Sequence, residues 1–197
     1  MKNKLSKIII ACMLVSMMCV SGVEAAAGKP KYLKSIDILS GYGLAKLHVL
    51  GSYRLFPLAV ALNYDLNPFL KEKKINLPGL FEFQIEPFAG ISPDPRSTNV
   101  ELGNTFGVKL GILPETSKFQ PYVKAGVGGV YMSLHTREQG TQFNFIEQGG
   151  VGAHYSLTHN TAFTAECRYR HLSNAAMNKP NHGINSLFFL AGITRTF

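Results

Sequence analysis

The feature that most constrains the fold of this chain is an alternation of apolar and polar side chains along several segments. In residues 162–173, AFTAECRYRHLS, one parity is apolar and the other is mostly charged. Residues 80–89, LFEFQIEPFA, and residues 100–113, VELGNTFGVKLGIL, repeat the pattern. Because successive side chains of a β-strand leave opposite faces, these segments are expected to be strands with one apolar and one charged face.

The alternation and the turn-like connectors SPDPRST, PETSK and THNT divide the chain into eight expected strands. Most exceed the usual length of soluble strands and reach the roughly 9 to 11 residues that a tilted strand needs to cross a bilayer. The charged segment from Asn67 to Gly79 is not assigned to an element. The expected strands are Lys34–Leu44, Leu47–Asn63, Gly79–Gly90, Val100–Leu113, Phe119–Leu134, Asn144–Leu157, Ala162–Ser173 and Asn185–Phe197.

Strands of this kind predict an all-β fold, an eight-stranded antiparallel outer-membrane β-barrel, because closure leaves no unpaired strand edge in the lipid. The alternative is a soluble, lipocalin-like barrel with an apolar lumen and a polar exterior. We favour the membrane barrel because the apolar parity carries the aromatic side chains. The charged parity is expected to form a network that fills the lumen and braces the seventh strand, made of Glu82, Glu86, Glu101, Lys109, Lys124, Glu166, Arg168 and Arg170.

The first residues have the pattern of a secretory signal peptide. Three lysines precede the apolar run Ile8 to Val20, and small residues follow in Val23 to Ala27. Cleavage is expected after Ala25 or Ala27, so we divide the chain into a cleaved signal peptide, residues 1–25, and a transmembrane barrel, residues 26–197. A retained anchor helix is the weaker alternative, because the apolar run is shorter than the roughly 20 residues of a membrane span.

The composition narrows the function classes. A formal net charge of +8 suits an anionic partner such as a phosphorylated glycolipid. The sequence has no basic and aromatic nucleic-acid motif, so no nucleic-acid partner is expected. It also has no metal-ligand cluster, phosphate-binding loop or nucleotide motif, so neither a metal nor a cofactor is expected. Cys167, the cysteine that remains after signal cleavage, is interpreted as a small apolar wall residue rather than a nucleophile.

A histidine and a serine stand two residues apart near the end of the seventh expected strand. On a strand, His171 and Ser173 leave the same face, with Cβ atoms about 6.5 Å apart. Their parity is the apolar outer one, where polar groups cost stability unless they are satisfied. If both termini lie in the periplasm, this end of the strand lies at the outer leaflet. The spacing alone is a weak sign of an active site, and an inert interfacial pair stays open.

Residues 166–193, ECRYRHLSNAAMNKPNHGINSLFFLAGI, carry a core R-Y-x-H-x-S-N-A followed by P-N-x-G-I-x-S. This segment resembles the PagL-type lipid A 3-O-deacylase family, and FEFQIEPFAG and QPYVKAGVGGVY extend a weaker similarity over most of the chain. The resemblance implies an eight-stranded outer-membrane barrel that hydrolyses an ester-linked acyl chain of lipopolysaccharide. It further implies that His171 is the general base, that Ser173 is the nucleophile, and that Asn174 and Asn181 bind the oxyanion or substrate.

One departure from the family pattern concerns Asn185, which stands where the family has the glutamate of its catalytic triad. Parity places Asn185 on the outer face with His171, so it is the expected third catalytic residue. An amide in place of the acid of a serine triad costs about 10⁴ in rate. Glu166 is a poor substitute because it has lumen parity, and the sequence does not place Glu147.

The expected function is therefore that of an outer-membrane serine esterase that removes the 3-O-linked acyl chain of lipid A, with its site at the outer leaflet. Its expected partners are lipopolysaccharide and the outer membrane, and a homodimer is left open. Two alternatives remain. One is a catalytically weak or inactive small barrel with a structural or adhesion role. The other is an acyltransferase, which shares the acyl-enzyme step.

Overall fold

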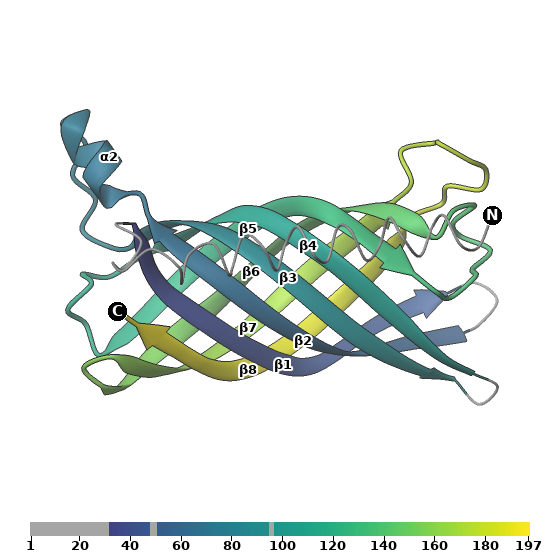
Figure 1. Cartoon of the computed structure of the whole chain (residues 1–197), viewed down its shortest axis with the longest axis horizontal. Coiled ribbons are helices and arrows are strands. Elements are labelled where there is room, and N and C mark those ends of the chain that lie inside the picture. Colours follow the sequence, from purple (N-terminus) through teal and green to yellow (C-terminus); the bar gives the residue numbers. More distant parts are fainter. Residues whose placement is uncertain (1–31, 48–50, 95–96) are drawn as a thin grey trace, which may run out of the picture. The chain divides into compact units, whose positions relative to one another are not determined.

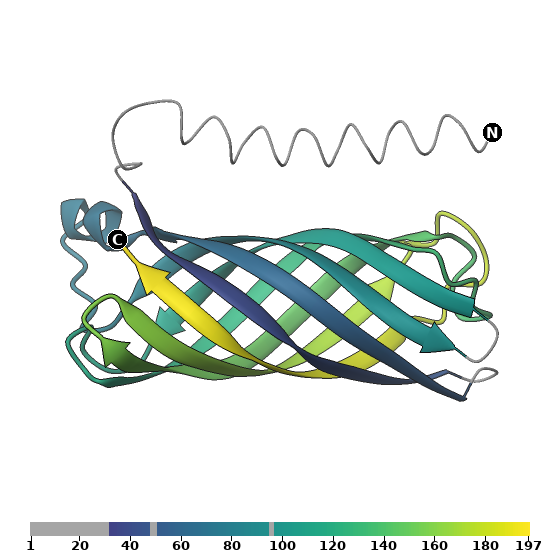
Figure 2. The same ribbon diagram turned by 60° about the horizontal axis from the view of Figure 1, so that its bottom comes forward.

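The computed structural model describes residues 32–47, 51–94 and 97–197. Within these residues, eight antiparallel strands follow one another around a closed barrel (Figures 1 and 2), which confirms the predicted fold class. The last strand pairs with the first from Ser35 opposite Thr196 to Ala45 opposite Ser186, so the sheet has no free edge. The strands are β1 (Leu33–Leu47), β2 (Gly51–Asp65), β3 (Phe81–Asp94), β4 (Ser97–Gly111), β5 (Phe119–Met132), β6 (Phe143–Thr158), β7 (Thr161–Ser173) and β8 (Ile184–Thr196).

The elements differ from the expected ones in three main places. β1 continues to Leu47, where the second strand was expected to begin, and β2 begins at Gly51. Most of the expected connector SPDPRST is strand, because β3 continues to Asp94 and β4 begins at Ser97. The unassigned charged segment contains a short helix, α2 (Asn67–Glu72), with Pro68 in its first turn. The predicted signal peptide, residues 1–25, lies outside the described residues. In the part of the chain that is described, no helix is long and apolar enough to cross a membrane.

The connections gather at two mouths of the barrel (Figure 1). The end that carries the C-terminus also carries α2, the connection from β4 to β5 and the turn from β6 to β7. The opposite end carries two ten-residue loops, residues 133–142 between β5 and β6 and residues 174–183 between β7 and β8. We call residues 174–183 the site loop, because His171 and Ser173 lie at the end of β7, directly before it.

The alternating parity of the strands separates a lipid-facing wall from a filled lumen. Phe163 and Tyr169 of β7 are exposed on the outside, whereas Glu166, Arg168 and Arg170, which have the other parity, are buried. The outer wall carries exposed apolar side chains on every strand. Its exposed large side chains include Ile38, Phe56, Leu58, Ile91, Phe106, Val108, Val127, Val151, Phe163, Phe189 and Ile193.

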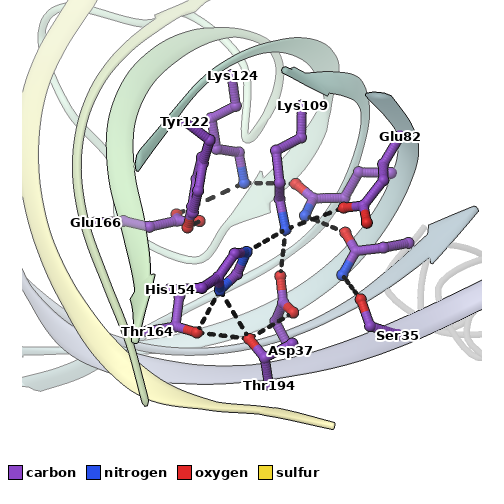
Figure 3. A network of polar contacts seen from close by, with 12 residues as sticks. Ser35, Asp37, Glu82, Lys109, Tyr122, Lys124, His154, Thr164, Glu166 and Thr194 are labelled. Carbon is purple, nitrogen blue, oxygen red and sulfur yellow. Dashed lines mark hydrogen bonds and ion pairs between the residues drawn. The ribbon is translucent and has the colours of Figure 1, made fainter. Parts of the chain in front are cut away.

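The half of the lumen nearer the C-terminus is a network of ion pairs and hydrogen bonds (Figure 3). Lys109 contacts Asp37 at 2.7 Å and Glu82 at 3.6 Å, and the ring of His154 bonds Thr164 at 2.8 Å. Every charged residue expected in the lumen is at most 7 % exposed, which confirms the predicted network. Because each of these charges has a partner of opposite sign, the barrel can bury charges that would otherwise destabilise it.

The half of the lumen nearer the site loop departs from the expected polar inner face. It is filled mainly by aliphatic and aromatic side chains, which pack into one buried cluster around the pair of Arg170 and Glu101. In the halves of β1 and β2 nearer the site loop the inward side chains are apolar, as most outward ones are, so alternation could not distinguish lumen from lipid there. The members of this apolar plug are Leu39, Ala45, Leu47, Tyr53, Leu55, Val130, Met132, Ile146, Leu172, Ile184, Phe188 and Leu190.

Candidate active site

His171 and Ser173 lie at the end of β7, on the outer wall, at the mouth opposite the C-terminus. Both side chains are half-buried, whereas Arg170 and Leu172 next to them point into the lumen and are buried. The histidine and the hydroxyl therefore leave the strand together toward the surroundings of the barrel, as their parity predicts. Neither group is in the lumen or at the other mouth.

Asn185 holds the ring of His171 from the neighbouring strand. It stands directly opposite His171 in the pairing of β7 and β8, and its Oδ1 lies 2.6 Å from Nδ1 of the ring. An amide oxygen only accepts hydrogen bonds, so Nδ1 is the nitrogen that carries hydrogen in this arrangement. The lone pair is then on Nε2, which is the form of the ring that can act as a base.

Gly183 makes room for the same ring. It is the last residue of the site loop and has a φ of +75°, a backbone conformation that side chains with a Cβ rarely adopt. A Cβ at this position would lie 2.5 Å from Cε1 and 3.2 Å from Nε2 of His171. Two physical constraints therefore favour glycine at this position of the P-N-x-G-I-x-S segment: the left-handed backbone conformation and the adjacent imidazole.

On the other side of His171, the neighbouring strand β6 presents a carboxylate. Glu147 pairs directly with His171, and Phe145 pairs with Ser173. The side chain of Glu147 is exposed on the outer wall. The imidazole therefore has an amide on one side, from β8, and a carboxylate on the other, from β6.

Asn174 and Asn181 hold the site loop in shape. The backbone N–H of Asn174 donates to Oδ1 of Asn181 at 2.9 Å, and its amide group donates to the carbonyls of Asn178 and Pro180 at 2.9 and 3.1 Å. All of the hydrogens of Asn174 that can donate are thus used within the loop. Asn181 is exposed and accepts at Oδ1, so its own amide group is the one that could still serve an oxyanion.

A second loop fixes the site loop from outside. The N–H of Gly140 donates to the carbonyl of Pro180 at 2.7 Å, and the N–H of His182 donates to the carbonyl of Glu138 at 2.8 Å. The side chain of Asn178 donates to the carbonyl of Gly140 at 3.0 Å. Residues 133–142 therefore position the segment that contains Asn181. Sequence reasoning did not identify this contact, because no local pattern links two loops that are about forty residues apart.

A groove of about 720 Å³ runs along the outer wall away from His171. Its floor is low because the outward positions at Ala125 and Gly149 carry almost no side chain, and a Cβ at Gly149 would meet nothing closer than 3.7 Å. Aromatic and branched side chains form the sides. The outward residues that line it are Phe83, Phe106, Val108, Ala125, Val127, Glu147, Gly149, Tyr169 and His171.

The lumen side of β7 fixes the strand beneath the site. Arg168 bonds both Glu86 of β3, with Nη2 at 2.8 Å from Oε2, and Glu166. Arg170 bonds Glu101 of β4 at 2.7 and 3.2 Å, and its guanidinium lies 4.6 Å from the ring centroid of Phe188. Bidentate arginine and carboxylate pairs are directional, so they hold β7 in one register across the barrel.

These residues together have the components of a nucleophilic hydrolase. A hydroxyl and an imidazole leave one strand side by side, and the ring is held in the basic tautomer. The sequence placed His171, Ser173 and Asn185 on one face; in the structure His171 and Asn185 are hydrogen-bonded, and Ser173 lies two residues further along the same strand. It adds Gly183, Glu147 and the second loop, of which only the glycine had a local signal.

Comparisons with known proteins address the family and the fold. The family described as lipid A 3-O-deacylase (PagL) matches residues 60–194. The crystal structure of the outer membrane enzyme PagL has a TM-score of 0.63 and 16 % identity, covering 82 % of this chain and 99 % of that one. Neisserial surface protein A has a TM-score of 0.62 and 16 % identity, covering 83 % and 96 %. No curated protein matches. At this identity the two structures demonstrate a shared barrel fold.

Proposed function

Because the chain belongs to the lipid A 3-O-deacylase (PagL) family, we propose that this outer-membrane barrel is a serine esterase that removes the 3-O-linked acyl chain of lipid A. The observation that carries the proposal is the outward placement of His171 and Ser173 at one mouth, with the ring held by Asn185. A base and a hydroxyl on the lipid face of a barrel serve no packing purpose. They are accessible there to an ester that never leaves the membrane.

The chemistry needs only groups of this chain and water. Nε2 of His171 takes the proton of Ser173 Oγ as that oxygen attacks the ester carbonyl carbon, and the carbonyl electron pair moves to its oxygen. When the tetrahedral intermediate collapses, the sugar oxygen leaves with the proton from the imidazolium. Water then attacks the acyl-serine, His171 again takes and returns the proton, and a free fatty acid is released.

The oxyanion of the intermediate needs hydrogen-bond donors near Ser173. We assign this role to the amide group of Asn181, which the site loop presents beside the end of β7. Asn174 contributes indirectly, because its hydrogen bonds to Asn178 and Pro180 hold the loop that carries Asn181. This division modifies the sequence expectation that both asparagines bind the oxyanion.

The groove on the outer wall suits an acyl chain. It is lined by apolar side chains and leads away from His171 along the lipid-facing surface. A chain that lies in it stays in an apolar environment while its ester carbonyl reaches Ser173. The substrate would therefore enter sideways from the membrane, without passing through the lumen.

We place the site at the outer leaflet, with both termini toward the periplasm. The turn between β6 and β7 at the C-terminal mouth has two residues, whereas the loops 133–142 and 174–183 of the site mouth have ten each; the connection 66–80, which contains α2, is the exception at the C-terminal mouth. Outer-membrane barrels have short periplasmic turns and longer extracellular loops. This orientation brings the site to the leaflet that contains lipopolysaccharide.

The test is mass spectrometry of lipid A from cells that express the wild-type protein or Ser173→Ala. The wild type is expected to convert lipid A to a species that lacks one 3-linked acyl chain, and Ser173→Ala is expected to leave it unmodified. Ser156→Ala is the matched control, because Ser156 lies near the end of β6 at the C-terminal mouth of the barrel, and this variant should keep full activity. Acyl loss that persists in Ser173→Ala would contradict the assigned nucleophile. Transfer of the chain to a second lipid, instead of free fatty acid, would identify an acyltransferase.

A non-catalytic barrel is the second candidate, and one observation favours it. Asn185 is neutral, so it cannot offset the positive charge that forms on His171 when the ring takes a proton. This candidate predicts that the folded, purified protein releases no fatty acid from lipopolysaccharide. The mass spectra of the wild type decide between the two.

A further inference from the structure

Glu147 is placed unlike the other carboxylates of the barrel wall. In the described parts of the strands, Asp37, Glu82, Glu86, Glu101 and Glu166 point into the lumen, where all are buried. Glu147 alone points outward and is exposed to the surroundings of the barrel. An ionised side chain on the lipid face of a barrel is destabilising. A residue that carries such a cost is a candidate for function.

The position of Glu147 along β6 adds to this cost. Phe145 and Phe143 lie beyond it toward the mouth, both exposed on the same wall, and their rings pack edge to face with centroids 5.4 Å apart. Outward aromatic side chains mark the interface between lipid and water in such barrels. Glu147 therefore lies on the membrane side of an aromatic pair, and solvent at the rim does not account for it.

The group that Glu147 faces is His171. The two residues pair directly across β6 and β7, which puts their Cβ atoms about 5 Å apart, and both line the same groove. Among the described residues, no lysine or arginine lies within salt-bridge distance of Glu147. On the far side of Asn185, the side chain of Lys46 borders the adjoining pocket of the outer wall. The positive charge of Lys46 on that side would destabilise a protonated His171 ring.

Asn185 performs one of the two roles that the acid performs in a serine triad. Its Oδ1 accepts from Nδ1, which orients the ring and leaves Nε2 as the base. It brings no negative charge to offset the imidazolium that forms when Ser173 gives up its proton. In a serine triad the acid does both, and it stays ionised throughout.

We propose that Glu147 is a positioning residue that supplies this missing charge. The two roles of the triad acid are then performed by two residues: Asn185 of β8 fixes the tautomer of His171, and Glu147 of β6 stabilises its imidazolium form. The inference rests on the proposed function. The proton moves between Ser173 Oγ, His171 Nε2 and the leaving oxygen, as before. Glu147 takes no part in the proton transfer, and no bond to it forms or breaks.

The size of the effect follows from the distance between the charges. Two unit charges about 6 Å apart at an effective dielectric constant of about 20 interact strongly enough to change a rate about 100-fold. This is less than the roughly 10⁴-fold loss for the acid of a serine triad, because the carboxylate acts here on the charge alone.

The experiment compares the rate of fatty-acid release from purified lipid A by the folded, purified barrel and its variants. Glu147→Gln removes the charge and keeps the shape, and we expect kcat to fall about 100-fold with little change in KM. Glu147→Asp, which keeps the charge, should retain most of the activity. Adding Asn185→Glu to Glu147→Gln returns a carboxylate to the ring from the other strand. This double variant should recover the lost activity, which a purely structural role of Glu147 would not permit.

Glu115→Gln is the matched control, because Glu115 is an exposed carboxylate at the C-terminal mouth. It should match the wild type. If the wild type releases fatty acid, Ser173→Ala does not, and Glu147→Gln is as active as the wild type, this inference is wrong and the proposed function stands. It is equally wrong if Glu147→Gln is impaired and Asn185→Glu gives no recovery. If the wild type itself releases no fatty acid, the proposed function fails and the role of Glu147 fails with it.

Discussion

The two faces of β7 are organised in opposite ways. On the lumen side, Arg168 and Arg170 each bond a carboxylate from a strand across the barrel, and both are buried. On the lipid side, the ring of His171 bonds Oδ1 of Asn185 at 2.6 Å and is partly open to its surroundings. One strand thus carries a closely bonded row and a sparsely bonded row, alternating residue by residue.

The lumen side of β7 contributes to the stability of the barrel, whereas the lipid side carries the reactive groups. The lumen row satisfies every charge internally, so it can hold β7 rigidly without exposing a reactive group. The lipid-side row leaves a base and a hydroxyl accessible, and Asn185 of the neighbouring strand orients the base. Changes on the two faces should therefore have separable effects, and three variants test this from the largest expected effect to the smallest.

Arg168→Met is expected to have the largest effect, and on stability alone. It leaves the carboxylates of Glu86 and Glu166 with one fewer cation in the lumen. Breaking a buried ion pair by removing one partner costs about 3 to 5 kcal/mol. Urea unfolding of the barrel in lipid vesicles measures the free energy of unfolding, and the activity per folded molecule should stay near that of the wild type.

The control for this variant is Arg195→Met. Arg195 is exposed and bonds Asn160 and Thr161 at 2.6 and 2.9 Å near the C-terminal mouth. An exposed interaction of this kind contributes about 1 kcal/mol or less. Equal losses of stability in the two variants would mean that the lumen network does not hold the barrel together.

Gly183→Ala is expected to have an intermediate effect, and on activity. The new Cβ would lie 2.5 Å from Cε1 of His171, so the ring has to move. A displacement of about 1 Å in a catalytic group costs about 100-fold in rate. The measurement is the rate of fatty-acid release from lipid A by the folded protein.

Gly51→Ala supplies the matched control for this change. Gly51 also has a positive φ, +72°, but a Cβ there would meet nothing within 4 Å. It carries the same backbone penalty, about 1 kcal/mol, without touching the site. If both alanine variants lose the same activity, the contact between Gly183 and the ring is irrelevant to the reaction.

Gly149→Leu is expected to have the smallest effect. The leucine would rise from the floor of the groove beside Tyr169, which pairs with Gly149. Because no atom lies close to that Cβ position, the barrel should fold normally, and only the space for an acyl chain is reduced. We expect about a 10-fold lower kcat/KM for lipid A, mainly through KM. Ala153→Leu, on the outer wall of the same strand but outside the groove, should be neutral.

The fold was predictable from the sequence where the two faces of a strand differ in polarity. In β7 and β3, carboxylates and arginines alternate with aromatic residues, so lumen and lipid sides could be assigned from parity. In the halves of β1 and β2 nearer the site loop both faces are mostly apolar, and the apolar plug under the site loop was not foreseen. Helix α2 was not foreseen either, because six residues are too few to show a helical period.

The candidate site was predictable only in part. His171, Ser173 and Asn185 lie on strands of known parity, so their shared face followed from counting. Glu147 belongs to a strand with the glycine pair Gly149 and Gly150, whose missing side chains interrupt the pattern. Its position opposite His171 depends on the register between β6 and β7, and the register is set by tertiary pairing across the whole strand.

The filled interior has a consequence for the traffic of small molecules. Aliphatic and aromatic side chains at one end and paired charges at the other fill the bore of the cylinder. If the barrel hydrolyses lipid A as proposed, the water that it consumes would then come from between the loops and the headgroups, and the released carboxylate would depart along the same boundary. Turnover would thus be governed by how far the surrounding leaflet admits water, a property of the host membrane as much as of the polypeptide.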